Sequence, residues 1–269
     1  MLLQRLNQRK TCGNHKGRPW RALEFDLEYA RQVQECLFPR KVPRIPGWDM
    51  AALCRPARHV SGDYCDLFLV APGRLAVGIG DVAGKGLGAG LVMAGLHALV
   101  RCCLRRQLHC LPCFFEGLNR YLLSATPEDL FVSLFLGVVE LETGRMQYVN
   151  AGHPPPLVFA GEQRPPKRLG DGGPVLGILP SVEFAEGSAV LEPGSLLFLF
   201  TDGLTESWDE DGRMFGETGV VQVVRSLGST CAGHLNRAVV KAIEAFCPCA
   251  DGRDDLAVIA LLSGQFQGC

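Results

Sequence analysis

The strongest constraint on the fold is the order in which strand-like and helix-like segments follow one another. Short apolar runs typical of strands come in groups separated by turn residues, and the helical patterns come in pairs instead of after each strand. A parallel sheet needs a crossover, usually a helix, between successive strands. The pattern therefore disfavours a doubly wound parallel sheet and predicts an α+β sandwich.

The individual elements are predicted from periodicity and from turn residues. Strands are expected at residues 50–54, 64–70, 75–79, 130–141, 146–150, 157–159 and 256–262, with a further pair around Glu192-Pro193-Gly194. The first three of these strands would form a meander. Helices are expected at residues 87–108, 113–124, 219–227 and 232–246.

The chain divides into three parts. Residues 1–22 form a basic leader that we expect to be mobile, residues 23–40 an amphipathic helix, and residues 41–265 one larger domain. The helix has an apolar seam in which one position is polar, made of Leu23, Leu27, Ala30, Gln34 and Leu37. This seam either packs on its own domain or pairs with a second copy in a parallel coil, where a polar residue helps to set the register.

Charge and hydropathy exclude several classes of protein. The chain has 27 Lys and Arg against 28 Asp and Glu, so it lacks the broad positive field of a nucleic-acid-binding protein. We find no apolar stretch long enough to span a bilayer, since the best, residues 130–139, is interrupted by Ser133 and Gly137. No signal peptide follows the basic N-terminus. We therefore expect a cytoplasmic protein that contacts neither nucleic acid nor membrane.

Twelve cysteines are scattered along the chain, and several lie within apolar stretches. We interpret them as reduced, mostly buried thiols. Two alternatives stay open: Cys110 and Cys113, together with Cys247 and Cys249, offer four soft ligands for zinc, and Cys110 and Cys113 alone have the spacing of a redox pair.

Aspartates at the ends of apolar strands are the most informative chemical feature. Asp63 precedes one strand, Asp81 and Asp202 end two others, and Asp254 with Asp255 opens the last. A carboxylate at such a position is costly to desolvate, and a divalent cation that gathers several of them compensates for the cost. Oxygen ligands suit Mg²⁺ or Mn²⁺. Each aspartate alone is better explained as a turn or helix cap, and it is the four positions together that indicate a metal site.

The glycine-rich loop at residues 80–86 has two competing explanations, and neither fits well. It resembles a dinucleotide-binding turn, but Asp81 would place negative charge on a pyrophosphate and no second βαβ unit follows. It is not a P-loop, because Ile79 stands where a glycine is needed.

Six motifs in the same order as in one family carry a resemblance that covers about residues 24–263. They are Ala30-Arg-Gln-Val-Gln-Glu-Cys-Leu-Phe-Pro39, Ser61-Gly-Asp-Tyr-Cys-Asp66, Gly80-Asp-Val-Ala-Gly-Lys-Gly86, Tyr148-Val-Asn-Ala-Gly-His-Pro-Pro155, Thr201-Asp-Gly-Leu-Thr-Glu206 and Arg253-Asp-Asp-Leu256. The chain resembles the bacterial SpoIIE-like branch of the PPM, or protein phosphatase 2C-type, serine/threonine phosphatases. Several motifs in order are far more specific than any single one.

The resemblance implies an α-β-β-α sandwich of two antiparallel sheets flanked by helices, with two Mn²⁺ or Mg²⁺ ions at one sheet edge. By position, Asp81 would bridge both ions, the Val82 carbonyl would bind the second, and Asp202 and Asp254 would complete the first. Asp63 would bind metal or metal-held water. Asp255 could replace Asp254 as the ligand, whereas Asp66 would be structural or lie in the outer shell. The roles of Lys85 and His153 stay open.

The resemblance also implies a function. It is the hydrolysis of phosphoserine or phosphothreonine in a regulatory protein, commonly an anti-sigma-factor antagonist of a stress or developmental pathway, by metal-activated water. Asp81, Asp202 and Asp254 would be the catalytic residues. The helix at residues 23–38 resembles a switch helix that pairs in a homodimer. The alternative is a catalytically silent module that binds a phosphoprotein or anti-sigma partner without hydrolysing it.

Overall fold

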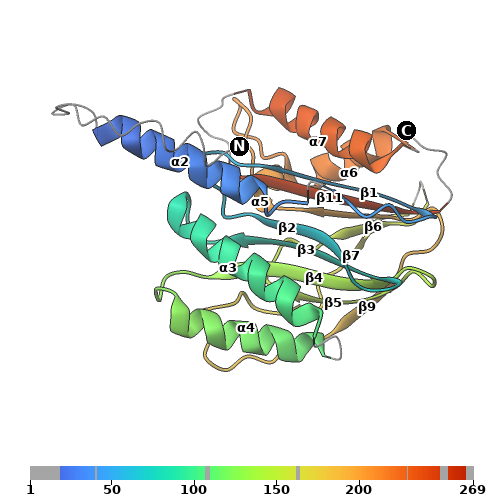
Figure 1. Cartoon of the computed structure of the whole chain (residues 1–269). Coiled ribbons are helices and arrows are strands. Elements are labelled where there is room, and N and C mark those ends of the chain that lie inside the picture. Colours follow the sequence, from blue (N-terminus) through green and yellow to red (C-terminus); the bar gives the residue numbers. More distant parts are fainter. Residues whose placement is uncertain are drawn as a thin grey trace, which may run out of the picture.

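The computed structural model describes residues 19–39, 41–106, 110–161, 164–228, 230–248 and 254–264. Most of the expected basic leader therefore lies outside the described residues. Its last four residues belong to the first helix, α2 (Pro19–Glu35), which starts before the expected residue 23 and projects beyond the body of the protein (Figure 1).

Two sheets form the centre of the molecule. Sheet A has the order β1-β11-β10-β6-β7, and sheet B has the order β2-β3-β4-β5-β8, with β9 also paired to β5. The strands of sheet A are β1 (Trp48–Arg55), β6 (Leu157–Phe159), β7 (Lys167–Arg168), β10 (Leu196–Phe200) and β11 (Leu256–Ser263). Those of sheet B are β2 (Tyr64–Ala71), β3 (Arg74–Val82), β4 (Val132–Glu140), β5 (Arg145–Ala151), β8 (Gly172–Gly173) and β9 (Gly187–Val190).

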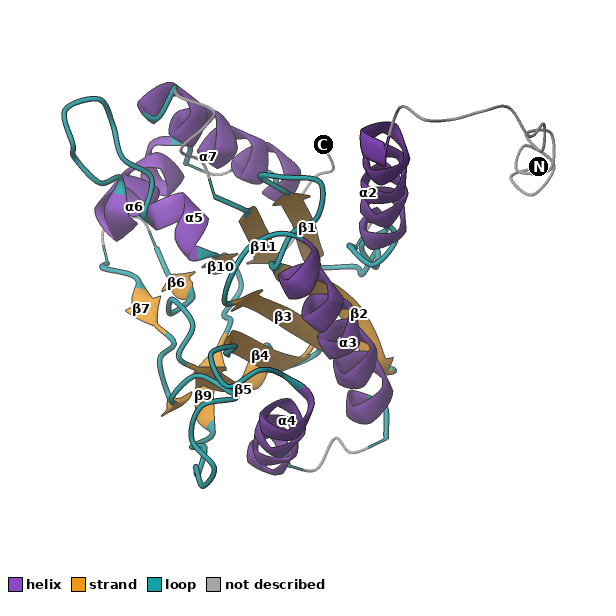
Figure 2. Ribbon diagram, turned by 90° about the vertical axis from the view of Figure 1, so that its left-hand side faces the viewer, coloured by secondary structure: helices purple, strands orange, loops and turns teal. Residues whose placement is uncertain are grey.

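Helices cover the outer face of each sheet, which gives the four layers of an α-β-β-α sandwich (Figures 1 and 2). The helices α3 (Leu87–Leu104) and α4 (Leu111–Ala125) cover sheet B, whereas α6 (Gly216–Ser226) and α7 (Ala232–Phe246) cover sheet A. A single turn of helix, α5 (Asp202–Thr205), follows β10. The predicted α+β sandwich is confirmed, with one short parallel pair, β5 with β8, in otherwise antiparallel sheets.

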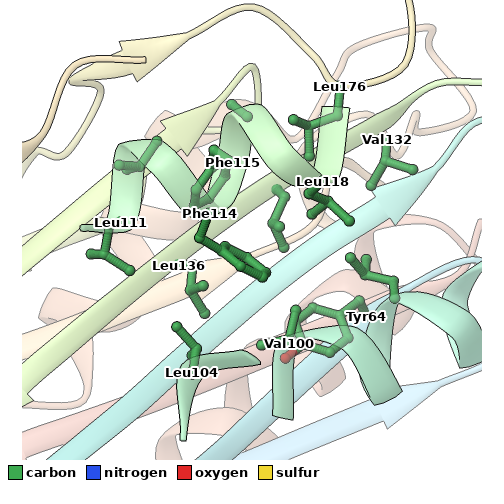
Figure 3. Close-up of a cluster of buried hydrophobic side chains, with 14 of the residues drawn as sticks. Tyr64, Val100, Leu104, Leu111, Phe114, Phe115, Leu118, Val132, Leu136 and Leu176 are labelled. Atoms are coloured by element: carbon green, nitrogen blue, oxygen red, sulfur yellow. The ribbon is translucent and has the colours of Figure 1, made fainter. Parts of the chain in front are cut away.

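The apolar runs form strands because both faces of the central strands are buried. In β10, Leu197 and Leu199 pack between the two sheets, while Phe198 and Phe200 pack against the helices over sheet A. A third cluster fills the space between sheet B and α3 and α4, and includes Leu111 and Phe114 (Figure 3). Strands that are buried on both sides lose the alternation of polar and apolar residues.

Three expectations about the elements are wrong. The expected meander of strands 50–54, 64–70 and 75–79 does not form, because β1 pairs with β11 in sheet A while β2 and β3 belong to sheet B. The two strands around Glu192-Pro193-Gly194 do not pair either, since β9 joins β5 and β10 joins β11 and β6. The tight turn between them passes the chain from one sheet to the other.

The third error concerns the longest apolar segment. The helix Leu87–Leu104, not residues 130–139, is long and apolar enough to cross a membrane by length and composition alone. In the structure this helix, α3, packs on sheet B through residues that include Met93, Leu96 and Val100. Packing within the domain therefore accounts for one face of the helix, while Leu87 and Leu91 are exposed.

The cysteines also differ from expectation. Cys110 and Cys113 are joined in a disulfide instead of being reduced thiols, and Cys36 and Cys102 are exposed. The zinc alternative is not supported, because Cys113 is in α4 over sheet B while Cys247 ends α7 over sheet A. Cys249 lies outside the described residues.

Candidate metal centre

Four of the aspartates singled out in the sequence lie at one edge of the sandwich. In sheet B, Asp63 immediately precedes β2 and Asp81 is the second-to-last residue of β3. In sheet A, Asp202 follows β10 and Asp254 lies two residues before β11. Because β2 with β3 and β10 with β11 are antiparallel pairs, the end of one strand lies beside the start of its neighbour. Each pair of aspartates therefore shares a sheet edge.

Two glycines let the segments that carry these residues approach closely. A Cβ atom at Gly62 would lie 2.9 Å from the Val82 carbonyl oxygen and 3.3 Å from Asp81 Oδ1. A Cβ atom at Gly203 would lie 2.0 Å from the Asp255 carbonyl oxygen. A side chain at either position would push the neighbouring segments apart. Gly62 is therefore needed for the part of the site in sheet B, and Gly203 for the part in sheet A.

Thr201 joins the two sheets at the site. Its buried Oγ1 donates a hydrogen bond to Asp63 Oδ2 at 3.0 Å and accepts one from the Ala257 backbone N–H at 2.9 Å. Sequence reasoning assigned no role to this residue. The available signal was a hydroxyl residue between a fully apolar strand and an aspartate, where a buried hydroxyl needs a partner.

The carboxylates raise one another's pKa. Burial, followed by the charge of Asp81, raises the pKa of Asp63 well above its ordinary value. Burial, followed by the charges of Asp202 and Asp254, raises the pKa of Asp81 from 3.8 to about 7. The pKa of Asp202 is also raised by burial, then by Glu206 and Asp254. The site is thus a group of like charges held in a poorly solvated place, which favours binding of a cation.

Asp254 and Asp255 have different surroundings. The Asp255 carboxylate accepts hydrogen bonds from the Ala57 N–H at 2.7 Å and the Gly62 N–H at 2.9 Å, so each of its oxygens holds the loop before β2. The Asp254 side chain is 43% exposed and forms an ion pair with Lys85 Nζ at 2.7 Å. Of the two neighbours, Asp254 is the one whose carboxylate an external cation can reach.

Asp66 lies away from this group. Arg101 of α3 donates to both of its carboxylate oxygens, each at 2.7 Å, and the Leu67 N–H donates at 2.9 Å. The Asp66 side chain is fully buried. This ion pair ties α3 to β2 and gives Asp66 a structural role.

His153 is also structural. Its Nδ1 lies 2.9 Å from Ser133 Oγ and its Nε2 lies 3.2 Å from the Phe200 carbonyl oxygen, so the ring connects sheet B to sheet A. Burial lowers the pKa of His153 to about 3, and the ring is therefore neutral near pH 7. With both nitrogens engaged and no charge, His153 does not suit the role of a general acid.

Gln34 connects α2 to the loop before Asp63. Its Nε2 donates to the Ser61 carbonyl oxygen and its Oε1 accepts from the Ser61 N–H, both at 2.8 Å. Leu37 packs against the cluster under α3. The C-terminal half of the predicted seam thus packs on its own domain, which was one of the two interpretations of the sequence.

The donors at this edge fit hard divalent cations. Carboxylate oxygens together with the Val82 carbonyl are the ligand type that Mg²⁺ and Mn²⁺ prefer. Within the described ranges, no three Asp, Glu, His or Cys side chains converge as in a completed metal site. Part of the reason is Asp254, which is turned toward Lys85. A cation at this edge would compete with the Lys85 ammonium for this carboxylate.

Comparisons with known proteins point to one family. Residues 71–262 match the family model described as Stage II sporulation protein E (SpoIIE). Protein IcfG of Synechocystis is 30% identical over 74% of this chain and 36% of its own length. The phosphoserine phosphatase RsbU of Bacillus subtilis is 28% identical over 71% of this chain and 56% of its own length. The chain thus spans about a third of the length of IcfG and little more than half of that of RsbU.

A solved structure agrees on the fold. The SiaA PP2C domain of Pseudomonas aeruginosa superimposes with a TM-score of 0.78 at 17% identity, covering 92% of this chain and 98% of that domain. At this identity the likeness concerns the architecture alone. The family match runs from the last residue of β2 into β11, and includes Asp81, Asp202 and Asp254. On this match, the chain belongs to the SpoIIE family of PP2C-type phosphatase domains.

Proposed function

We propose that this chain is a metal-dependent protein serine/threonine phosphatase that hydrolyses phosphoserine or phosphothreonine in a regulatory protein. The observation that carries the proposal is the group of buried carboxylates that both sheets bring to one edge. Asp63, Asp81 and Asp202 each have a pKa raised by burial and by neighbouring carboxylates. Such a group is unfavourable unless cations bind there. RsbU, a relative within the same family, is a phosphoserine phosphatase.

We propose Asp63, Asp81, Asp202, Asp254 and the Val82 carbonyl as ligands of two Mn²⁺ or Mg²⁺ ions. When bound, such ions activate water for attack on phosphorus and neutralise the phosphoryl oxygens. The protein's own groups prepare the site. Thr201 fixes the Asp63 carboxylate, and Asp255 fixes the loop that carries it. Asp81, Asp202 and Asp254 are accordingly the residues whose loss should abolish turnover.

The substrate is proposed to be an anti-sigma-factor antagonist. This part rests on the resemblance of the ordered motifs to the SpoIIE-like branch. The site itself supports the hydrolysis of a phosphate ester at an edge rich in oxygen donors.

The experiment compares hydrolysis of para-nitrophenyl phosphate by wild type and by Asp81→Asn, with and without millimolar Mn²⁺. We expect turnover that requires Mn²⁺ and falls by more than about 100-fold in the variant, beyond the loss typical of an outer-shell partner. Asp129→Asn is the matched control, because Asp129 is exposed in the turn before β4. If calorimetry shows that wild type binds no Mn²⁺, the proposal is wrong and the silent binding module is favoured.

We also propose a homodimer through residues 23–38, but by a different face from the predicted seam. Phe25, Tyr29 and Val33 are 62%, 50% and 50% exposed and recur every four residues along α2. Residues four apart share one helix face, so these three form an apolar stripe. Light scattering should give a dimer for wild type and a monomer for Phe25→Ser/Tyr29→Ser. An unchanged mass would exclude pairing through this stripe.

A further inference from the structure

The disulfide between Cys110 and Cys113 lies outside the candidate metal centre and has no role in the proposed phosphatase. Cys110 is the residue that caps the start of α4, and Cys113 is in the first turn of that helix. The neighbouring Leu111 and Phe114 point into the cluster beneath the helix (Figure 3). The apolar residues therefore anchor the turn, while Cys113 is exposed.

The local geometry stabilises a thiolate at Cys110. Its Sγ accepts a hydrogen bond from the Cys113 backbone N–H at 3.1 Å. The first N–H groups of a helix have no partner within the helix, and the aligned peptide dipoles place partial positive charge there. Both effects favour the thiolate, the form that exchanges with disulfides, as in Cys-X-X-Cys motifs at helix starts.

A purely stabilising role explains this disulfide less well. The two cysteines are only three residues apart. The stabilisation that a disulfide gives by restricting the unfolded chain grows with the length of the loop that it closes, so a loop this short gains the least. An exposed sulfur on a short loop is instead accessible to other thiols.

We propose that Cys110 and Cys113 form a redox-active pair that exchanges with external thiols and disulfides. In the reducing direction, an external thiolate attacks Cys113 Sγ, which forms a mixed disulfide and breaks the bond to Cys110 Sγ. Cys110 leaves as the thiolate that the Cys113 N–H stabilises. A second external thiolate then attacks the external sulfur of the mixed disulfide and releases Cys113. Two electrons pass from two external thiols to the protein, the external sulfurs form one disulfide, and oxidation is the reverse.

Two exposed cysteines serve as internal controls. Cys36 and Cys102 are exposed free thiols, and Cys36 Sγ donates to the Gln32 carbonyl oxygen. Neither has a second cysteine at the spacing of the pair in α4. They report what exposure does without the helix start and without a cysteine three residues away.

The first experiment equilibrates the full chain at pH 7 with glutathione at a series of ratios of reduced to oxidised form. Acid quenching, alkylation and mass spectrometry then measure how much of the 110–113 pair is closed. We expect a reversible transition that reaches the same point from either direction. A pair that stays closed in excess reductant would overturn the proposal, and so would one that stays open in excess oxidant.

The second experiment tests the assignment of Cys110 as the stabilised thiolate. Cys113→Ser keeps the backbone N–H that faces Cys110. Its Cys110 should be alkylated by iodoacetamide at pH 7 about tenfold faster than Cys102 in the same molecule, because more of it is thiolate. Equal rates for Cys110 and Cys102 would contradict the assignment. Neither measurement uses phosphatase activity, so the inference stands or fails independently of the proposed function.

Discussion

Two buried carboxylates at the start of β2 have opposite environments, although they are only three residues apart. Asp66 receives two hydrogen bonds from the Arg101 guanidinium, whose carbon also lies 4.8 Å from the centre of the Phe68 ring. Asp63 receives one hydrogen bond from the neutral Thr201 hydroxyl, and its other neighbours include carboxylates. The protein supplies a cation for the first carboxylate and further negative charge around the second.

The difference separates a structural aspartate from a candidate ligand. A buried charge is stable when it is paired and hydrogen-bonded within the protein. Asp66 meets this condition by itself. Asp63 and Asp81 do not, and Lys85 pairs with Asp254 instead, at the exposed margin of the group. Asp63 and Asp81 are therefore assigned to external cations, and Asp254 joins them as a ligand that also has Lys85 beside it.

The largest effect should follow from breaking the paired half of this comparison. Arg101→Met leaves the Asp66 carboxylate buried without its cation, and we expect a loss of about 3 kcal/mol in the free energy of unfolding, the lower part of the range for a broken buried pair because Arg101 is 35% exposed. Urea denaturation measures it. Turnover per folded molecule should change less than about threefold, because Asp66 does not belong to the metal group.

A second substitution controls this prediction. Adding Asp66→Asn to Arg101→Met removes the uncompensated charge and should recover part of the lost stability. The contrary outcome is that Asp66→Asn lowers the free energy of unfolding by the same amount in Arg101→Met as in wild type. The two residues would then not be coupled, and the ion pair would not be what stabilises this part of β2.

The fold class and the gathering of aspartates at one edge were predictable, and the pairing of strands was not. Apolar strands separated by turns indicate a sandwich, but Pro193-Gly194 looks the same whether the flanking strands pair with each other or enter different sheets. Only packing between β10 and both its neighbours in sheet A decides this. The same limit applies to β1, which joins β11 from the other end of the chain.

Within the site, the sequence could not distinguish adjacent residues or long-range partners. Asp254 and Asp255 are chemically identical neighbours, and their roles differ because the Ala57 and Gly62 N–H groups face only one of them. Arg101 is one of several arginines, and nothing in its local sequence indicates Asp66 as its partner. Composition favoured reduced thiols over a disulfide between Cys110 and Cys113. The exposure of Cys113 could not be predicted either, because it depends on how α4 packs.

The smaller effect should come from the unpaired half, through pH. The pKa of Asp81 is about 7 in the folded protein and 3.8 as the ordinary value, so between these pH values the folded state binds more protons than the unfolded state. In EDTA, the contribution of this group should be fully present below about pH 4 and should be lost as the pH rises toward 7. The full shift corresponds to roughly 4 kcal/mol, and we expect about 2 kcal/mol because Asp81 is only partly buried and water screens the charges around it.

Asp81→Asn isolates that contribution, because the amide does not titrate. Urea midpoints measured in EDTA at intervals from pH 4 to 7.5 should fall more steeply for wild type than for the variant. With saturating Mn²⁺, which favours the charged carboxylate, the midpoints of wild type should no longer fall more steeply than those of the variant. Parallel curves for the two proteins would show that Asp81 is not held among like charges. The comparison with Asp66 would then lose its basis, since both carboxylates would be satisfied within the protein.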